Sequence, residues 1–161
     1  MRTLVIGDIH GGYKALIQVL ERAQVTTEDK LVFLGDYVDG WSESAQTIQK
    51  LIELSVSNEC VFIRGNHDLW CGLWIDKGVT NPVWLAHGGK ETITSYIQSG
   101  YVVNPNHKAF FLEQLQNYYI DKENRLFLHA GFTSMHGVGS CLLYTSPSPR
   151  DLSTSRMPSS A

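Results

Sequence analysis

The sequence predicts an α/β fold built around a largely parallel sheet. Between residues 3 and 63, short apolar runs rich in Val, Ile, Leu and Phe alternate with longer stretches whose apolar residues recur at helical spacing. Strands that alternate with helices form βαβ units, which place their strands parallel in one sheet. Clusters of Asp, His and Asn follow the predicted strands at their carboxyl ends, where open α/β sheets bind ligands.

The predicted strands are four apolar runs, each short enough for a buried strand. They are Thr3–Ile6, residues 31–34, residues 60–63 and Leu126–Leu128. Residues 11–24 and 42–55 lie between the first three runs and carry the apolar stripe of a helix. Ser42 or Ser44 is the expected N-cap of the second helix, because a serine side chain can accept from the exposed N–H groups of the first turn.

The later part of the domain is predicted to be mostly helical. A helix is expected over residues 66–75, a loop over 77–87 because of Gly, Asn and Pro, and two further helices over 91–98 and 108–118. Residues 119–121 and 125–128 flank a Lys-Glu-Asn turn, which predicts a hairpin.

The last 21 residues have a different origin from the rest of the chain in our interpretation. Residues 141–151 and 155–161 resemble two translated segments of a sequencing-library adapter in one reading frame. A natural Ser/Pro-rich disordered tail is the alternative, because its composition would be similar. We therefore divide the chain into a domain over residues 1–140 and a disordered adapter-derived segment over 141–161, and we leave this segment out of the fold prediction.

Composition and charge exclude several classes of protein. Leaving out Arg150, Asp151 and Arg156 changes the net charge from −3 to −4, which argues against a nucleic-acid-binding surface. No apolar run is long enough to span a membrane, and no charged-then-apolar leader precedes the first strand. Cys60 and Cys71 are expected to be reduced packing residues. We expect a cytoplasmic enzyme that binds neither nucleic acid nor a membrane.

The polar clusters contain residue types that bind metal ions. Asp8 and His10 lie two residues apart, so their side chains share a face if the strand extends to them. Asp36, Asn66 and His129 arrive from the ends of neighbouring strands. Carboxylate, imidazole and amide oxygen together suit Mn, Fe or Zn, and a pair of such ions can hold a phosphoryl group for in-line displacement.

Two further residues could complete a catalytic site. His67 is free to act as a general acid toward a leaving oxygen. Asp39 could hold the imidazole of His67 in the required tautomer.

The joint pattern of motifs resembles the calcineurin-like metallophosphoesterases, and in particular the bacterial serine/threonine protein phosphatase and diadenosine tetraphosphatase branch. The motifs lie at residues 7–11 (Gly-Asp-Ile-His-Gly), 35–40 (Gly-Asp-Tyr-Val-Asp-Gly), 65–68 (Gly-Asn-His-Asp), 84–96 and 128–131 (Leu-His-Ala-Gly). Any one of them alone would be weak evidence, but their order along residues 1–140 is specific.

The resemblance implies a four-layer β-sandwich with flanking helices and a centre of two divalent metal ions, with manganese favoured. It implies that Asp8, His10 and Asp36 bind the first ion and that Asp36, Asn66 and His129 bind the second. It further implies that a hydroxide bridging the two ions attacks the phosphorus. His67 and Asp39 then form the acid dyad.

Three departures from the family pattern affect these expectations. Gly40-Trp41 stands where the phosphoprotein phosphatases carry a phosphate-gripping Arg, so Arg64 is the remaining candidate for substrate binding, with a structural role as the alternative. His87 stands where relatives carry Asn, and its role stays open. The late Gly-His motif that supplies a further ligand is missing from the sequence. We therefore expect a natural gene with additional C-terminal strands, and we expect weakened metal binding in the chain as written.

The sequence thus predicts a metal-dependent phosphoesterase that hydrolyses phosphomonoesters, as a serine/threonine protein phosphatase-like enzyme. A dinucleoside polyphosphate hydrolase is the alternative enzyme, and a non-catalytic binding module with an incomplete site is the alternative from another class. The expected substrates are a phosphorylated protein or a small phosphoester. The sequence does not predict the oligomeric state.

Overall fold

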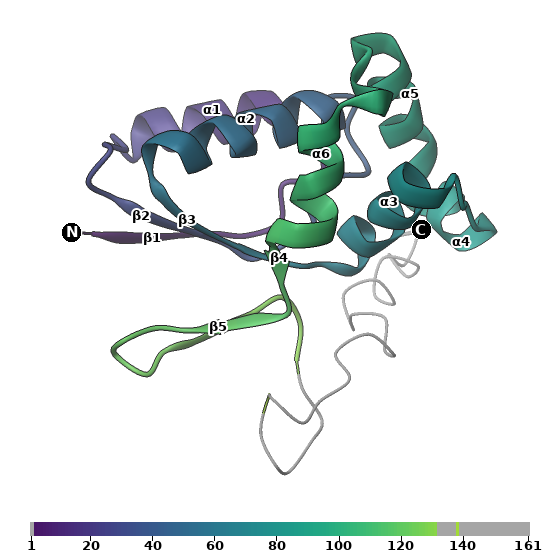
Figure 1. Ribbon diagram of the computed structural model, residues 1–161. Helices are drawn as coiled ribbons and strands as arrows, with labels where there is room; N and C mark the ends of the chain where they lie inside the picture. The colour runs from purple at the N-terminus through teal and green to yellow at the C-terminus, as the bar shows by residue number, and fades with distance from the viewer. Residues whose placement is uncertain (1, 132–137, 139–161) are drawn as a thin grey trace, which may run out of the picture. The chain divides into compact units, whose positions relative to one another are not determined.

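A four-stranded parallel sheet organises the domain in the computed structural model, which describes residues 2–131 and 138 (Figure 1). The strands lie in the order β1 (Thr3–Ile6), β2 (Lys30–Phe33), β3 (Glu59–Ile63) and β4 (Leu115–Gln116), and each pairs in parallel with the next. The predicted α/β class is therefore confirmed. Because the strands are parallel, their carboxyl ends form one common edge of the sheet. The segment attributed to an adapter, residues 141–161, lies outside the described residues.

Two helices connect the first three strands and cover one face of the sheet. They are α1 (Tyr13–Arg22) and α2 (Ser44–Ser57), which run beside each other over the strands in Figure 1. Leu16 and Ile48, on these helices, are buried in the same core as Leu31 and Phe33 of β2. Side chains alternate along a strand, so Val32 points to the opposite face and belongs to a second core.

The second core lies against a small antiparallel sheet. Strands β5 (Tyr118–Ile120) and β6 (Leu126–Leu128) form the predicted hairpin, with Tyr119 paired to Phe127. Both aromatic side chains pack against Val32, Val61 and Ile63 of the parallel sheet. The parallel sheet is thus covered by helices on one face and by the hairpin on the other, which is the start of the expected sandwich.

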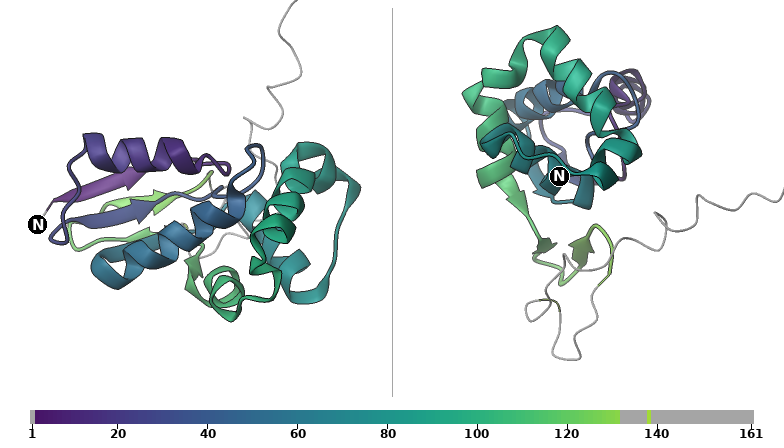
Figure 2. Two further views of the ribbon diagram at one scale, coloured as in Figure 1. Left: turned by 90° about the horizontal axis from the view of Figure 1, so that it is seen from above. Right: turned by 90° about the vertical axis from the view of Figure 1, so that its right-hand side faces the viewer.

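Further helices gather at the carboxyl end of the parallel strands, as Figure 2 shows from above. They are, in chain order, α3 (Asn66–Lys77), α4 (Pro82–Trp84), η1 (Leu85–Gly89), α5 (Lys90–Ser99), η2 (Tyr101–Val103), α6 (Pro105–Ala109) and η3 (Phe110–Gln114). Contacts of α5 and α6 with α2, and of η3 with β4, hold this group of helices against the rest of the domain.

Three predictions of local structure are wrong. The expected loop over 77–87 contains α4 and part of η1, because Asn81 caps a turn that begins with Pro82. The expected helix over 108–118 ends at Gln114, because pairing with Phe62 of β3 draws Leu115 into an extended strand. Neither serine caps α2: its N-cap is Glu43, which makes no capping bond, and Ser44 turns its hydroxyl toward Thr92.

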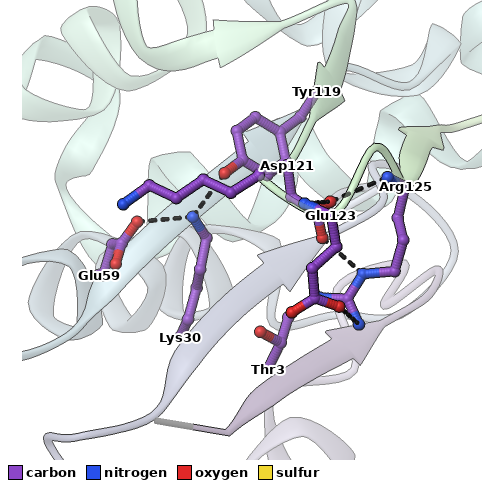
Figure 3. A pocket seen from close by; sticks show the side chains of 8 residues that line it. Thr3, Lys30, Glu59, Tyr119, Asp121, Glu123 and Arg125 are labelled. Carbon is purple, nitrogen blue, oxygen red and sulfur yellow. Dashed lines mark hydrogen bonds and ion pairs between the residues drawn. The ribbon is translucent and has the colours of Figure 1, made fainter.

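A pocket of about 160 Å³ lies at the opposite edge of the parallel sheet, where β1, β2 and β3 begin (Figure 3). Lys30 donates to Glu59 at 2.6 Å and to the Tyr119 hydroxyl at 2.7 Å, and Arg125 pairs with Asp121 and Glu123. The Lys30–Tyr119 bond joins the hairpin to the parallel sheet, whereas the Lys30–Glu59 pair lies within the parallel sheet and the Arg125 pairs lie within the hairpin.

The structure also describes the two cysteines of the domain and the length of its helices. Cys60 and Cys71 are both free thiols, and Cys71 is buried, as expected for reduced packing residues. Among the described residues, no helix has the length and apolar character needed to cross a bilayer.

Candidate active site

Asp36 stands at the centre of the carboxyl edge of the sheet. It follows β2 with a left-handed backbone (φ 54°), and it is only 3% exposed. Its carbonyl oxygen accepts from the backbone nitrogens of Ile9 (3.0 Å) and His10 (2.9 Å), which joins the loops after β1 and β2. This backbone pairing brings the Asp36 carboxylate and the His10 imidazole to the same place.

Two histidines present the nitrogen that metal ions bind. The Nε2 atoms of His10 and His129 lie 4.0 Å and 3.1 Å from Asp36 Oδ2. Their Nδ1 atoms lie 3.1 Å from the carbonyl oxygen of Val38 and 2.8 Å from that of Leu34, respectively. A carbonyl oxygen only accepts, so Nδ1 carries a proton in both rings, and Nε2 is the nitrogen that faces Asp36. This tautomer is the one that metal-binding histidines adopt.

The electrostatics of this cluster favour a bound cation. Burial would raise the pKa of Asp36, but the imidazoles of His129, His67 and His10 outweigh it and hold this pKa below its ordinary value. Burial would also lower the pKa of His129, but the hydrogen bond to Asp36 raises it to about 9. The buried carboxylate thus attracts positive charge to its surroundings, which a divalent ion can supply in place of protons.

His67 and Asp39 form the predicted dyad. The Nδ1 atom of His67 lies 2.6 Å from Asp39 Oδ2, and both side chains are buried. Burial would lower the pKa of His67, but the hydrogen bond to Asp39 and the charge of Asp36 raise it above its ordinary value. Ligand atoms of His10, Asp36 and His67 lie within 4.8 Å of one another, so the dyad adjoins the candidate metal site.

Asp39 has additional donors that the sequence did not reveal. Trp84 Nε1 donates to Asp39 Oδ2 at 2.7 Å, and Thr92 Oγ1 donates to Asp39 Oδ1 at 2.6 Å. Both residues belong to the motif at 84–96, which the sequence analysis used only as part of the family resemblance. The family resemblance of this segment was the available signal, but it gave neither residue a role.

Asp68 links the two loops that carry the site. Its buried carboxylate accepts from the backbone nitrogens of Asp36 (2.8 Å), Tyr37 (2.9 Å) and Gly65 (2.8 Å). Burial and the Asp36 carboxylate raise the pKa of Asp68 to about 7. Asp68 thus completes the capping box at the start of α3 and supports the backbone of the candidate ligand Asp36.

The remaining predicted site residues come from several segments of the chain. Asp8 follows β1 at the same edge, and Asn66 is the first residue of α3, directly before His67. Arg64 donates to the Leu115 carbonyl at 3.0 Å, a contact that connects β3 to β4 and favours its structural role.

Trp41 is 70% exposed at the loop that carries Asp39. His87 is exposed and bonds the Val83 carbonyl within its own helical segment.

Comparison with known proteins decides the family. The model of the calcineurin-like phosphoesterase family matches residues 1–158. The chain belongs to this family. The metallophosphoesterase fold predicted from the motifs is therefore confirmed.

The relatives of this calcineurin-like phosphoesterase include proteins named as protein phosphatases and proteins named as dinucleoside tetraphosphatases. A serine/threonine-protein phosphatase, PP2A-like PPG1, of Candida albicans is 42% identical over 66 residues, which cover 40% of this chain and 16% of the relative. The asymmetrical bis(5'-nucleosyl)-tetraphosphatase PrpE of Anoxybacillus flavithermus is 26% identical over 140 residues, or 79% of this chain and 56% of the relative. The chain thus spans at most about half of the length of these relatives.

A solved structure shares the fold of this phosphoesterase domain. A protein assigned as a diadenosine tetraphosphatase superposes with a TM-score of 0.63 at 20% identity. The match covers 87% of this chain and 55% of that protein.

Proposed function

We propose that the chain is a metal-dependent phosphoesterase that hydrolyses phosphomonoesters, with phosphorylated serine or threonine in proteins as its substrate class. The observation that carries this proposal is the buried Asp36 carboxylate beside the Nε2 atoms of His10 and His129, at 4.0 Å and 3.1 Å. The paired His67 and Asp39 beside it supply a proton donor for a leaving oxygen. Family membership supports the same chemistry.

The donor set fits divalent metal ions. Asp8, His10 and Asp36 would bind the first ion, and Asp36, Asn66 and His129 the second, with manganese favoured among the metals suited to oxygen and imidazole ligands. When bound, such ions supply an activated water and stabilise the charge that develops on the phosphoryl oxygens.

The protein's own residues orient the metal-binding nitrogens and supply the proton for the leaving group. His10 and His129 keep their Nδ1 protons on backbone carbonyls, so both rings stay fixed with Nε2 toward Asp36. His67 keeps its Nδ1 proton on Asp39, which leaves Nε2 to deliver a proton to the oxygen of the departing alcohol.

A dinucleoside polyphosphate hydrolase is the second candidate. A relative that covers 79% of this chain is named an asymmetrical bis(5'-nucleosyl)-tetraphosphatase. The exposed Trp41 occupies the position at which phosphoprotein phosphatases carry an arginine, which offers a base-stacking surface in place of a phosphate-binding cation.

We place either enzyme in the cytoplasm, where the free Cys60 and Cys71 would stay reduced.

Turnover of three substrates with and without manganese tests the proposal. We expect hydrolysis of p-nitrophenyl phosphate and of a phosphoserine peptide, loss of activity with a chelator, and recovery on adding Mn²⁺. Faster hydrolysis of diadenosine tetraphosphate than of the peptide would favour the second candidate. No turnover of any of the three would leave a non-catalytic binding module as the better interpretation.

The variant Asp36→Asn connects this activity to the site. It removes the buried negative charge while keeping the shape, so we expect a loss of about 100-fold or more in kcat/KM. Asp76→Asn is the matched control, because Asp76 pairs with Lys108 on the surface at 2.8 Å. Activity of Asp36→Asn equal to that of the control would contradict the proposed site.

A further inference from the structure

The Asp39 carboxylate is enclosed by side chains of the α4–α5 segment. Its Oδ2 atom accepts from His67 Nδ1 at 2.6 Å and from Trp84 Nε1 at 2.7 Å. Its Oδ1 atom accepts from Thr92 Oγ1 at 2.6 Å, and Thr92 Oγ1 accepts in turn from the Asp39 backbone nitrogen at 2.9 Å. Asp39, Trp84 and Thr92 are all fully buried, so water does not compete for these bonds.

The donor and acceptor inventory fixes the proton on His67. An indole N–H only donates, so Trp84 requires Asp39 Oδ2 to be an acceptor. Thr92 receives the Asp39 N–H and lies 2.9 Å from Ser44 Oγ, so Ser44 can donate to it while its own proton goes to Asp39 Oδ1. With Trp84 and Thr92 both donating to Asp39, the 2.6 Å contact at Oδ2 is completed when the Nδ1 atom of His67 carries a proton and donates it.

Two glycines allow the segment to approach Asp39 this closely. A Cβ on Gly88, which has a φ of 101°, would overlap the backbone nitrogen of Gly40 and lie 3.0 Å from the Asp39 backbone. A Cβ on Gly89 would lie 2.6 Å from the indole of Trp84. Trp84, the glycine pair and Thr92 therefore act as one unit that closes over the dyad.

We propose that Trp84 and Thr92 are positioning residues that hold the Asp39 carboxylate, and through it the His67 imidazole, in the orientation that protonates the leaving oxygen. This inference rests on the proposed phosphoesterase function. Both side chains are fully buried, so each would act through Asp39. Loss of either donor frees the carboxylate to rotate and lets His67 change its tautomer.

This role predicts a dependence on the leaving group. A general acid contributes most when the departing alkoxide is strongly basic, as from phosphoserine, and least when it is weakly basic, as from p-nitrophenyl phosphate. A variant that merely destabilises the fold lowers both activities by the same factor. The ratio of the two kcat values therefore separates positioning from general damage.

Two matched pairs of variants in the Mn²⁺-loaded 161-residue chain test the inference. In the first pair, Thr92→Val removes the hydroxyl, and the control Thr92→Ser keeps it. In the second pair, Trp84→Phe removes the indole N–H that bonds Asp39. Its control, Trp74→Phe, replaces a neighbouring indole whose ring centroid lies 6.1 Å from that of Trp84. For Thr92→Val and Trp84→Phe we expect kcat on the phosphoserine peptide to fall about 10-fold, with KM unchanged and kcat on p-nitrophenyl phosphate lowered less than about 3-fold. The two controls should keep the parent ratio.

A second readout does not depend on turnover. In the parent without metal, at a pH high enough for the His67 ring to be neutral, nitrogen NMR of His67, assigned with His67→Asn, should show a single Nδ1–H tautomer, and Thr92→Val and Trp84→Phe should show a mixture. Parent-like leaving-group ratios and a single tautomer in both variants would overturn the inference. An inactive parent would contradict the proposed function alone, because the tautomer measurement still decides this role. If Trp84→Phe does not fold, the Thr92 pair decides.

Discussion

The buried carboxylate of Asp68 accepts a hydrogen bond of 2.8 Å from the backbone nitrogen of Asp36, the central candidate metal ligand. The same Asp68 oxygen accepts from the nitrogen of Gly65 at 2.8 Å. One side chain therefore holds the loop after β2 and the loop after β3 at a fixed separation. Asn66 and His67 follow Gly65 directly, so this separation also sets their distance from Asp36.

Replacing Asp68 with Asn should weaken metal binding. An amide offers one acceptor oxygen, and its NH₂ group would face backbone N–H donors that now point at a carboxylate. Loss of a group that orients metal ligands typically lowers metal affinity about 10- to 100-fold. Calorimetric titration of Asp68→Asn with Mn²⁺ measures this loss, with Asp76→Asn as control. Parent-like affinity would show that the two loops keep their separation without Asp68.

Gly65→Ala should damage the same site by a steric route. A Cβ at this position would overlap the Oδ1 atom of Asp36 and lie 2.5 Å from its backbone nitrogen. Overpacking of this kind costs about 1–3 kcal/mol of stability. We expect Mn²⁺ affinity to fall as well, because the carboxylate itself must move.

Gly78→Ala is the matched control for this substitution. Gly78 has a φ of 67°, so alanine there is strained, but its Cβ would meet nothing within 4 Å. Chemical denaturation and calorimetry of both variants should show lost stability in each, with lost metal affinity only for Gly65→Ala. Equal metal affinity in the two variants would refute the steric argument.

Strands β1, β2, β3 and β6 and the residues at their ends were predictable because each is determined by local sequence. The apolar runs that form these strands were identified to within one residue at each end. His10, Asp36 and the dyad residues follow β1, β2 and β3, and His129 follows β6. The motif at 65–68 also predicted the start of α3 at Asn66.

The residues that sequence reasoning missed depend on partners distant in the chain. Leu115 continues a helical pattern, yet its backbone pairs with Phe62, more than fifty positions earlier. Ser44 has the residue type of a cap, but its hydroxyl lies 2.9 Å from Thr92 on α5. Such roles depend on which helices and strands pack together, and the local sequence pattern does not determine this packing.

Thr47→Val should stabilise the domain. In the part of the chain that the structure describes, the Thr47 hydroxyl is buried on α2 without a hydrogen-bond partner. An unsatisfied buried polar group is costly, and valine has nearly the same shape, so we expect a gain of about 1 kcal/mol. Urea unfolding measures the change.

Thr94→Val on α5 serves as the control for Thr47→Val, because the Thr94 hydroxyl is exposed and bonds the Lys90 carbonyl. This substitution should change stability little. A stability of Thr47→Val at or below that of the parent would indicate that the Thr47 hydroxyl has a partner after all.

His107 should make the domain less stable in acid. Its ring is fully buried between α2 and α5, where its nitrogens lie 3.1 Å from the Tyr96 hydroxyl and 3.1 Å from Gln49 Oε1, and it stacks on Tyr101. Burial lowers the pKa of His107 from 6.5 to about 4. Between these two pH values the unfolded chain binds a proton here that the folded chain does not bind. Stability is therefore complete above pH 6.5 and decreases as the pH falls toward 4, by about 3 kcal/mol in total.

The variant His107→Gln isolates this contribution. Glutamine can still bond to Tyr96 or Gln49 but does not titrate, so its free energy of unfolding should depend less on pH within this window. Urea unfolding at several pH values between about 4 and 7 measures the slope for the parent, for His107→Gln and for His87→Gln, which removes an exposed imidazole. The His107 variant alone should flatten the slope. Equal slopes in all three proteins would mean that the buried ring takes up its proton without opening the fold.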